Sequence, residues 1–197
     1  MQKIRNSAGK LRVSYNAPVV LTFVLLCVAV QGLNLLTGGV SNRLLFSVYR
    51  SSPLDPLAYL RVFLHVLGHS GWEHLLNNMM YLLILGPMLE EKYGSQTMLF
   101  TIGATALATG LVNLIFFPHT ALLGASGIVF AWILLSSITV TERNTIPLSF
   151  LLVAVLYLGQ QVYGGLFTRD NISQMAHIVG GIVGSVTGFA INHGKRV

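Results

Sequence analysis

The chain has 197 residues, of which 53% are hydrophobic and only 9% are charged. Soluble domains usually carry about 25% charged residues because their surface faces water, so this composition excludes a water-facing globule and indicates a protein embedded in lipid. The net charge of +6 comes from basic residues scattered at segment ends, without interleaved aromatic side chains, which argues against nucleic-acid binding. The single cysteine, Cys27, excludes a disulfide within the chain.

Six apolar segments predict an all-α integral membrane protein, since a helix needs about 20 apolar residues to cross the hydrocarbon. The predicted spans are 18–36, 72–89, 97–117, 126–140, 146–167 and 172–191. They predict a six-helix membrane domain over residues 17–192, an N-terminal tail over 1–16 and a C-terminal tail over 193–197. The first span is long enough to be a retained anchor rather than a cleaved signal.

The connection between the first two spans, residues 37–71, is too long for a tight turn and too apolar for a floppy linker. It contains Pro53 and Pro56, and residues 57–67 can form a short helix that lies in the membrane interface. We expect an ordered and partly embedded loop.

The placement of lysine and arginine predicts an orientation, because basic residues favour the cytoplasmic side of a membrane. With the N-terminus inside, the inner set is Lys3, Arg5, Lys10, Arg12, Lys92, Arg143, Lys195 and Arg196. The outer set is Arg43, Arg50, Arg61 and Arg169. The prediction is a multi-pass cell-membrane protein with both termini in the cytoplasm.

Polar side chains interrupt the spans at one membrane depth, although each costs free energy in hydrocarbon. The predicted span 126–140 would be only about 22 Å long against a core of about 30 Å, so Ser126 begins it about 8 Å below the outer boundary. His177, five residues into the sixth span, lies at a similar depth. So do His74 and Asn78, which share one face of the second span. These four side chains predict a polar site that opens toward the extracytoplasmic side.

The residues around Ser126 suit nucleophilic chemistry. Gly124 and Gly127 permit a sharp turn and a close backbone approach, and a helix N-terminus favours developing negative charge. Ser126 can attack a carbonyl if His177 takes its proton. His74, Asn78 and the Ser126 backbone N–H are candidate donors to the resulting oxyanion.

Small residues on the sixth span predict how the serine and the histidine meet. Gly180, Gly184 and Gly188 recur every four residues after His177, and such a stripe lets helices pack closely in lipid. Against Gly127 and Ala131 of the fourth span, it would bring the imidazole to Ser126. No acidic residue lies at this depth, so we expect a dyad, with Phe130 holding the imidazole by ring contact.

Three separated motifs resemble the rhomboid family of intramembrane serine proteases. They are His65-x3-His69-x4-His74-x3-Asn78 followed by Glu90 and Gly94, then Gly124-Ala125-Ser126-Gly127, then Ala176-His177-x2-Gly180-x3-Gly184. The resemblance covers residues 61 to about 188, the minimal six-helix core. The chain departs from the family pattern at Phe130, where tyrosine is frequent, and at Leu60-Arg61, where the pair Trp-Arg is frequent.

The resemblance implies that Ser126 is the nucleophile, that His177 is the general base, and that His74 and Asn78 help form the oxyanion hole. It implies cleavage of transmembrane segments of other membrane proteins, with no cofactor and no metal. The fifth helix and the cap loop would admit the substrate, so Gly159, Gln160 and Gln161 would be soft, polar positions at that gate.

Other interpretations stay open beside this one. The chain could be a catalytically silent relative that binds membrane clients, although it keeps both reacting groups. A transporter would place polar residues through the full depth, and here the inner halves of the spans are apolar. His65, His69 and His74 could bind zinc, but no cysteine and no carboxylate beyond Glu73 completes such a site. Structural roles are expected for the following residues: His65 and His69 (loop brace), Arg61 (loop anchor), Asn77, Glu90 and Glu91.

Overall fold

Helices make up most of the chain that the computed structural model describes, which is residues 13–138, 145–167 and 171–194. In chain order they are α1 (Pro18–Leu36), α2 (Val40–Leu44), α3 (Pro56–Leu64), η1 (His65–Leu67), α4 (Trp72–Tyr93), α5 (Ser95–Phe116), α6 (Ser126–Ser137), α7 (Leu148–Phe167) and α8 (Asn171–Gly194). Within the described ranges the only strand-like pairing is an isolated bridge between Val48 and Leu122. The all-α prediction is confirmed.

Each predicted span corresponds to one helix. Four helices, α1, α5, α7 and α8, are long and apolar enough to cross a membrane by length and composition. Helix α4 has 22 residues but carries charged groups at both ends, and α6 has only 12 residues. Helix α6 begins at Ser126 as predicted and ends at Ser137, earlier than the predicted end at residue 140. In its last turn the hydroxyls of Ser136 and Ser137 donate to the carbonyls of Ile133 and Leu134.

Other predicted boundaries shift by a few residues; for example, α4 continues to Tyr93 beyond the predicted end at 89, and α5 begins at Ser95 before the predicted start at 97. Helix α7 begins at Leu148, one residue after Pro147, and α8 continues to Gly194, beyond the predicted end of the membrane domain at 192. Most basic residues behind the predicted orientation, including Arg143 and Arg169, lie outside the described residues.

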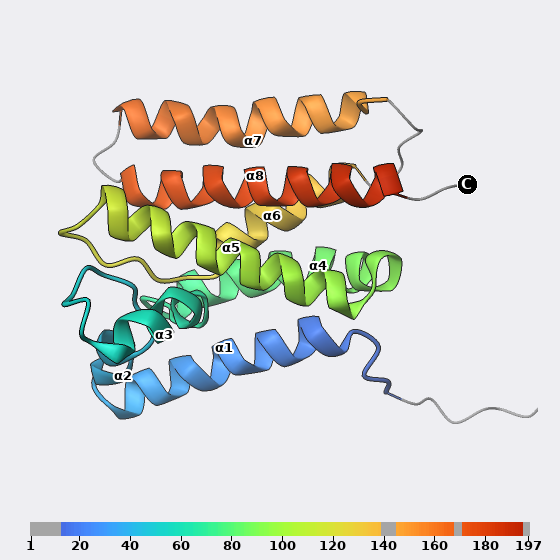
Figure 1. Cartoon of the computed structure of the whole chain (residues 1–197). Coiled ribbons are helices and arrows are strands. Elements are labelled where there is room, and N and C mark those ends of the chain that lie inside the picture. The colour runs from blue at the N-terminus through green and yellow to red at the C-terminus, as the bar shows by residue number, and fades with distance from the viewer. Residues whose placement is uncertain (1–12, 139–144, 168–170, 195–197) are drawn as a thin grey trace, which may run out of the picture.

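Helix α6 is the centre of the bundle. Eight of its residues are buried, from Gly127 to Leu135, and it contacts α4, α5, α7 and most extensively α8. Helix α7 forms one edge of the bundle beside α8, and α1 lies on the opposite side against α4 (Figure 1). A short helix surrounded in this way holds its first residue inside the protein rather than at the lipid.

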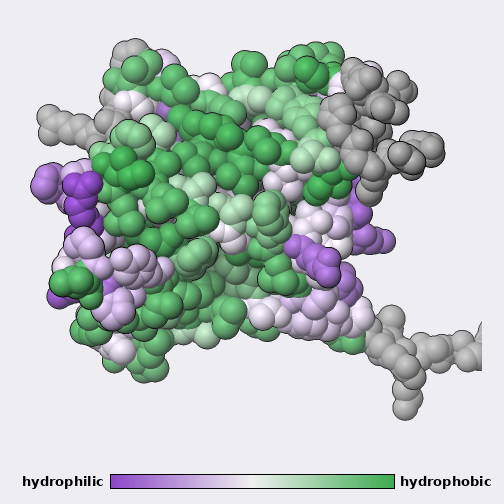
Figure 2. All heavy atoms as spheres, viewed as in Figure 1, coloured by the Kyte–Doolittle hydropathy of each residue, from purple (hydrophilic) through white to green (hydrophobic). Residues whose placement is uncertain are grey.

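The outer surface matches a lipid environment. The middle of the face in Figure 2 is hydrophobic, and hydrophilic residues gather toward its left and right ends. Along α7, no residue of the apolar window within Leu148–Leu166 is buried, and exposed side chains there include Leu152, Val155 and Leu156. Because such a surface is unfavourable in water, the chain is a membrane protein.

Glycines on α8 allow it to touch the backbone of α6, as predicted. A Cβ atom added to Gly180 would overlap the carbonyl oxygen of Gly127, and one added to Gly184 would overlap that of Ala131. Only a residue without a side chain fits at either position. This close contact sets the distance between the helices that carry Ser126 and His177.

The loop between α1 and α4 is ordered and contains the predicted helix as α3 and η1, together with α2, which was not predicted. Arg61 anchors it: the guanidinium is 2% exposed, pairs with Asp55, donates to the Ser51 hydroxyl at 2.8 Å, and lies 4.4 Å from the centre of the Tyr49 ring. Asp55 also caps α3 by accepting from the Leu57 N–H. The hydrogen bond from Arg61 holds the pKa of Asp55 below its ordinary value of 3.8.

Two buried histidines brace this loop against the bundle, as predicted. His65 Nδ1 donates to the Val62 carbonyl at 3.0 Å, and its Nε2 lies 3.1 Å from the Thr109 hydroxyl of α5. His69 Nδ1 donates to the Leu67 carbonyl, while its Nε2 accepts from the Ala125 N–H at 3.5 Å. Burial lowers the pKa of each histidine from 6.5 to about 4.

We expect these histidines to make the protein less stable as the pH falls from about 6.5 to 4. The unfolded chain takes up protons near pH 6.5 and the folded chain only near pH 4, so stability is fully present above that interval and is lost through it. For His65 alone the loss is at most about 3 kcal/mol. The thermal unfolding midpoint in detergent should fall by roughly 6–12 °C for such a loss in a chain of this size.

A His65→Gln variant gives the control, because glutamine keeps a polar side chain but does not titrate. Its midpoint should depend less on pH between 4 and 7 than that of the parent chain. If the midpoint of the variant depended on pH as steeply as that of the parent, protonation of His65 would not be a cause of the loss in stability. Asp55 does not interfere, since its lowered pKa places its titration below 3.8.

Candidate active site

Side chains from three helices surround one cavity of about 240 Å³ at the N-terminal end of α6. Its lining residues are His74, Asn77, Asn78, Tyr81, Ser126, Val129, Phe130 and His177. The structure therefore brings together the five side chains singled out from the sequence. It also places them at the depth where α6 starts inside the bundle.

The turn before α6 presents Ser126 to this cavity. Gly124 has φ of +129°, a conformation that favours glycine, and a Cβ there would lie 2.7 Å from Cε1 of His74. The Gly124 N–H donates to the His65 carbonyl at 2.9 Å, which ties the turn to the loop. Gly127 faces the Thr109 methyl group and the Ala176 carbonyl of α8, where an added Cβ would lie 3.2 and 3.4 Å away. The two glycines thus allow the buried turn that leads into Ser126 and let α8 approach.

The His177 ring is held by contacts from two neighbouring helices. It stacks on Phe130 with ring centres 4.2 Å apart and planes inclined by 5°. Its Nδ1 lies 2.8 Å from Oε1 of Gln161 on α7. Phe130 is one helical turn after Ser126, so the stacked imidazole lies over the same face of α6. Among the described contacts no hydrogen bond joins Ser126 to His177 directly, and the two side chains meet across the shared cavity.

His74 and Asn78 lie on the α4 wall of the cavity. Asn78 is 6% exposed, and its Nδ2 is buried with no hydrogen-bond partner among the described residues. His74 Nδ1 lies 3.1 Å from the Ser70 hydroxyl, and its ring contacts the edge of His69 with centres 5.0 Å apart. A buried amide donor without an acceptor costs free energy, so its presence beside Ser126 and His177 points to a group that it binds in the working protein.

Sequence reasoning missed four residues of this site or its support. Asn77 and Tyr81 lie on the same face of α4 as His74 and Asn78, and the spacing 74, 77, 78, 81 is the helical signal that could have found them. Asn77 was expected to be a structural hydrogen bonder, and it instead lines the cavity. Val129 lies three residues after Ser126 on α6 and therefore faces the same cavity. Gln161 was expected at a substrate gate, which no observation tests; its amide contacts His177, while Gly159 and Gln160 are exposed.

Two of the three histidines considered as zinc ligands, His65 and His69, use their ring nitrogens in contacts with the protein. Both ring nitrogens of His65 and both of His69 have protein partners. In the described part of the chain, no cluster of three or more histidine, cysteine, aspartate or glutamate side chains could hold a metal ion. The zinc interpretation therefore has no support from the geometry.

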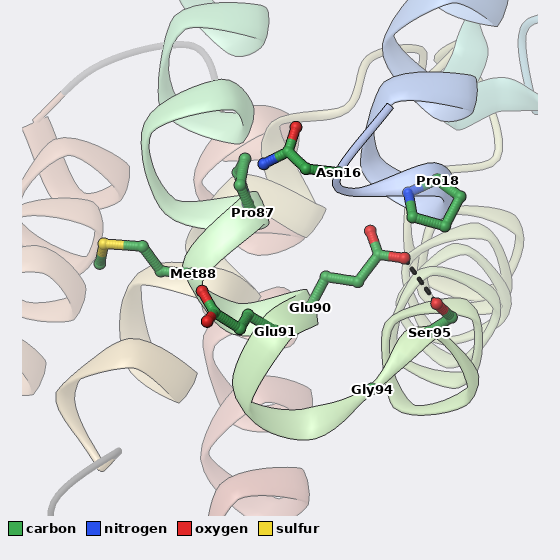
Figure 3. Close-up of a pocket in the computed structure, with 8 residues that line it drawn as sticks. All are labelled: Asn16, Pro18, Pro87, Met88, Glu90, Glu91, Gly94 and Ser95. Carbon is green, nitrogen blue, oxygen red and sulfur yellow. Dashed lines mark hydrogen bonds between the residues drawn. The ribbon is translucent and has the colours of Figure 1, made fainter. Parts of the chain in front are cut away.

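A larger cavity, of about 600 Å³, lies at the far end of α4 and contains a carboxylate with a structural role (Figure 3). Glu90 accepts from the backbone N–H groups of Val19 and Val20 at 3.0 Å and from the Ser95 hydroxyl at 2.7 Å. It thus satisfies free donors at the start of α1 and joins α1, α4 and α5. The structural role expected for Glu90 is confirmed.

Comparison with known proteins places the site in a family. Residues 56–193 match the family model described as the Rhomboid domain. The chain belongs to the rhomboid family. The matched range runs from the first residue of α3 almost to the end of α8 and contains every residue that lines the cavity.

Individual rhomboid relatives agree with this assignment. Over 139 residues the chain is 30% identical to Rhomboid-related protein 2 of Mus musculus, covering 64% of this chain and 46% of the relative. It is 29% identical over 137 residues to Rhomboid-like protein 11, chloroplastic, of Arabidopsis thaliana, covering 60% and 47%. It is 26% identical over 196 residues to Rhomboid protease GlpG of Yersinia pestis, covering 96% and 65%. The chain therefore spans about half the length of the first two relatives and about two thirds of the third.

Proposed function

We propose that this chain is an intramembrane serine endopeptidase that hydrolyses peptide bonds in or near transmembrane segments of other membrane proteins. One observation carries the proposal: a serine at the start of α6 and a histidine of α8, stacked on the ring one turn after that serine, border a cavity that also contains a buried amide without a partner among the described residues. These are the nucleophile, base and oxyanion donor that acyl transfer needs. The related protein named Rhomboid protease GlpG supports the same reaction class.

In the first step, Ser126 Oγ attacks the scissile carbonyl carbon while its proton passes to Nε2 of His177. The carbonyl oxygen becomes an anion and accepts hydrogen bonds from Asn78 Nδ2, from His74 and from the backbone N–H of Ser126. That N–H is free of intrahelical partners because it lies in the first turn of α6. The imidazolium then protonates the leaving nitrogen, and an acyl ester on Ser126 remains.

In the second step, water gives a proton to His177 and its hydroxyl to the acyl carbon. The tetrahedral intermediate collapses, the Ser126 oxygen regains its proton, and the product acid leaves. Phe130 supports both steps by keeping the imidazole plane parallel to its own ring. Residues Gly124 and Gly127 support them by shaping the turn. We propose no cofactor and no metal.

The substrates in this proposal are membrane proteins with a transmembrane segment that reaches the cavity. The membrane domain of residues 17–192 would lie in a cell membrane with the tails 1–16 and 193–197 in the cytoplasm. The active site would then open toward the extracytoplasmic side, where the start of α6 lies. Polar residues Ser70, Glu73 and Asn77 border an adjoining open cavity of about 410 Å³ that also contacts His74 and offers water a path.

Reconstitution in liposomes tests the function directly. A model single-span substrate should yield two fragments whose masses locate one cut within or beside the span. A serine-directed phosphonate probe should block cleavage and add its mass to the tryptic or chymotryptic peptide that contains Ser126. Binding of the substrate without cleavage or probe labelling would favour the alternative, a catalytically silent rhomboid relative that binds membrane clients.

The oxyanion-hole role predicts a large loss of turnover in Asn78→Ala. We expect kcat to fall by about one to three orders of magnitude, the effect of removing one oxyanion donor. KM should change little, because the donor acts mainly on charge that develops in the transition state. Initial rates of cleavage over a range of substrate-to-lipid ratios measure both constants.

Asn77→Ala is the matched control for that variant. Asn77 is the neighbouring amide on the same cavity wall, but it is exposed rather than buried. Its removal should therefore change kcat far less. Equal rates for the parent and Asn78→Ala would remove Asn78 from the mechanism.

A further inference from the structure

We infer that Gln161 of α7 is a positioning residue that fixes the tautomer and the ring orientation of His177. The inference rests on the proposed function and adds a third member to its Ser126–His177 pair. It starts from one contact: Nδ1 of His177 lies 2.8 Å from Oε1 of Gln161, although the two residues are 16 positions apart on different helices.

The chemistry of the two atoms gives the contact its direction. A carboxamide oxygen only accepts hydrogen bonds, so the imidazole Nδ1 must donate. In a neutral histidine this places the single proton on Nδ1 and leaves Nε2 with a lone pair. Nε2 is then the basic nitrogen, as the proposed mechanism requires. The amide oxygen also stabilises the imidazolium that forms when Ser126 gives up its proton.

None of the described residues that line the cavity offers a carboxylate for this part. Its eight lining residues include no aspartate, glutamate, lysine or arginine, and the titratable side chains among them, apart from His177, are His74 and Tyr81. Tyr157 of α7 packs against Phe130, the ring on which His177 stacks, with ring centres 6.0 Å apart. A neutral amide is therefore the group that the structure offers where serine hydrolases with a triad use a carboxylate.

The hydrogen bond between Gln161 and His177 depends on how α7 packs, because Gln161 lies on that helix. Helix α7 is the edge helix of the bundle, packed on α8 and α6 with the rest of its surface exposed (Figure 1). Because Gln161 belongs to α7 and His177 to α8, this hydrogen bond lasts only while the two helices stay packed together. A displacement of α7 would break this hydrogen bond, whereas the stack of the imidazole on Phe130 involves only α6 and α8.

Kinetics of three variants test the positioning role. Gln161→Met keeps the length of the side chain but removes the strong acceptor, and we expect kcat to fall about 10- to 100-fold with KM nearly unchanged, as for other residues that orient a functional imidazole. Gln161→Glu retains an acceptor oxygen in either protonation state and should restore kcat to within about threefold of the parent. Gln160→Met is the control, because Gln160 neighbours Gln161 but is exposed.

Nitrogen-15 NMR of the histidine rings gives a readout that does not depend on activity. In detergent at neutral pH, the His177 signal, assigned by its loss in His177→Ala, should show a protonated Nδ1 and an unprotonated Nε2. In Gln161→Met the two nitrogens should move toward a tautomer mixture, while Gln160→Met should match the parent. An unchanged tautomer together with parental kcat in Gln161→Met would overturn the inference.

The two proposals fail in different ways. If the parent chain cleaves no substrate, the function fails and the NMR comparison alone decides whether Gln161 holds the imidazole. If the parent cleaves but Gln161→Met changes neither kcat nor the ring signals, the function stands and the positioning role falls.

Discussion

Replacing Ser126 with alanine is expected to abolish cleavage of a reconstituted single-span substrate, with a fall in rate of about 10⁴-fold or more. Without Oγ there is no atom to attack the carbonyl. His177→Ala should cost about as much, because an unassisted serine hydroxyl is a weak nucleophile. The double variant should be no worse than either single one, since the two residues act as a unit. Fragment formation in liposomes, followed by mass spectrometry over hours, measures all three.

Ser137→Ala is the matched control on the same helix. Its hydroxyl donates to the Leu134 carbonyl at 2.6 Å at the far end of α6, away from the cavity. This variant should cleave at the parental rate and should also keep the parental thermal midpoint, as should Ser126→Ala. Fragments of the same mass from Ser126→Ala would refute the dyad.

Gly184→Ala is expected to damage both stability and activity although the residue does not touch the cavity. A Cβ at this position would overlap the carbonyl oxygen and carbonyl carbon of Ala131, and those backbone atoms cannot rotate away. Helices α6 and α8 must separate, which costs about 1–3 kcal/mol for an overpacked site. For a chain of this length the thermal midpoint should fall by roughly 2–12 °C.

The same separation should reduce cleavage. Because His177 is carried by α8 and Ser126 by α6, a shift of a few tenths of an ångström to 1 Å changes the geometry of proton transfer, and misplacement by 1 Å can cost about 10²-fold in rate. Thermal unfolding in detergent and initial rates in liposomes measure the two effects. Both should change together in this variant.

Gly103→Ala on α5 is the control for the glycine substitution. An added Cβ there meets nothing within 4 Å, and alanine favours a helix over glycine by up to about 1 kcal/mol. Its midpoint should stay the same or rise. A Gly184→Ala variant as stable and as active as the parent would show that α6 and α8 do not need this contact.

The short length of α6 explains why its N-terminal end, which the proposed chemistry uses, lies inside the protein. Its 12 residues span only about 18 Å, well short of a hydrocarbon core of about 30 Å. A helix this short avoids exposing its ends to lipid because α4, α5, α7 and α8 surround it. The free N–H groups of its first turn then lie inside the protein, next to a cavity rather than in bulk solvent.

The sequence by itself determined the helices and the identity of most residues at the site. Long apolar runs specify membrane helices almost without reference to their neighbours, because every backbone group must be paired inside the lipid. The polar residues within those runs could be recognised as site candidates because a polar side chain in hydrocarbon costs free energy. They are His74, Asn78, Ser126 and His177. The stripe of Gly180 and Gly184 likewise predicted the contact between α6 and α8, because small residues let two membrane helices pack closely.

Only the tertiary structure decided how the helices turn about their own axes and which polar groups meet. Helix α7 is apolar on nearly every side and no residue of its apolar window is buried, so its sequence does not indicate which face meets α8. Gln160 and Gln161 are therefore equivalent in the sequence, and packing alone sends one to His177 and the other to the surface. The physical reason is that burial in lipid rewards apolar composition along a helix, whereas a hydrogen bond between helices depends on rotation and spacing set by all of the neighbours together.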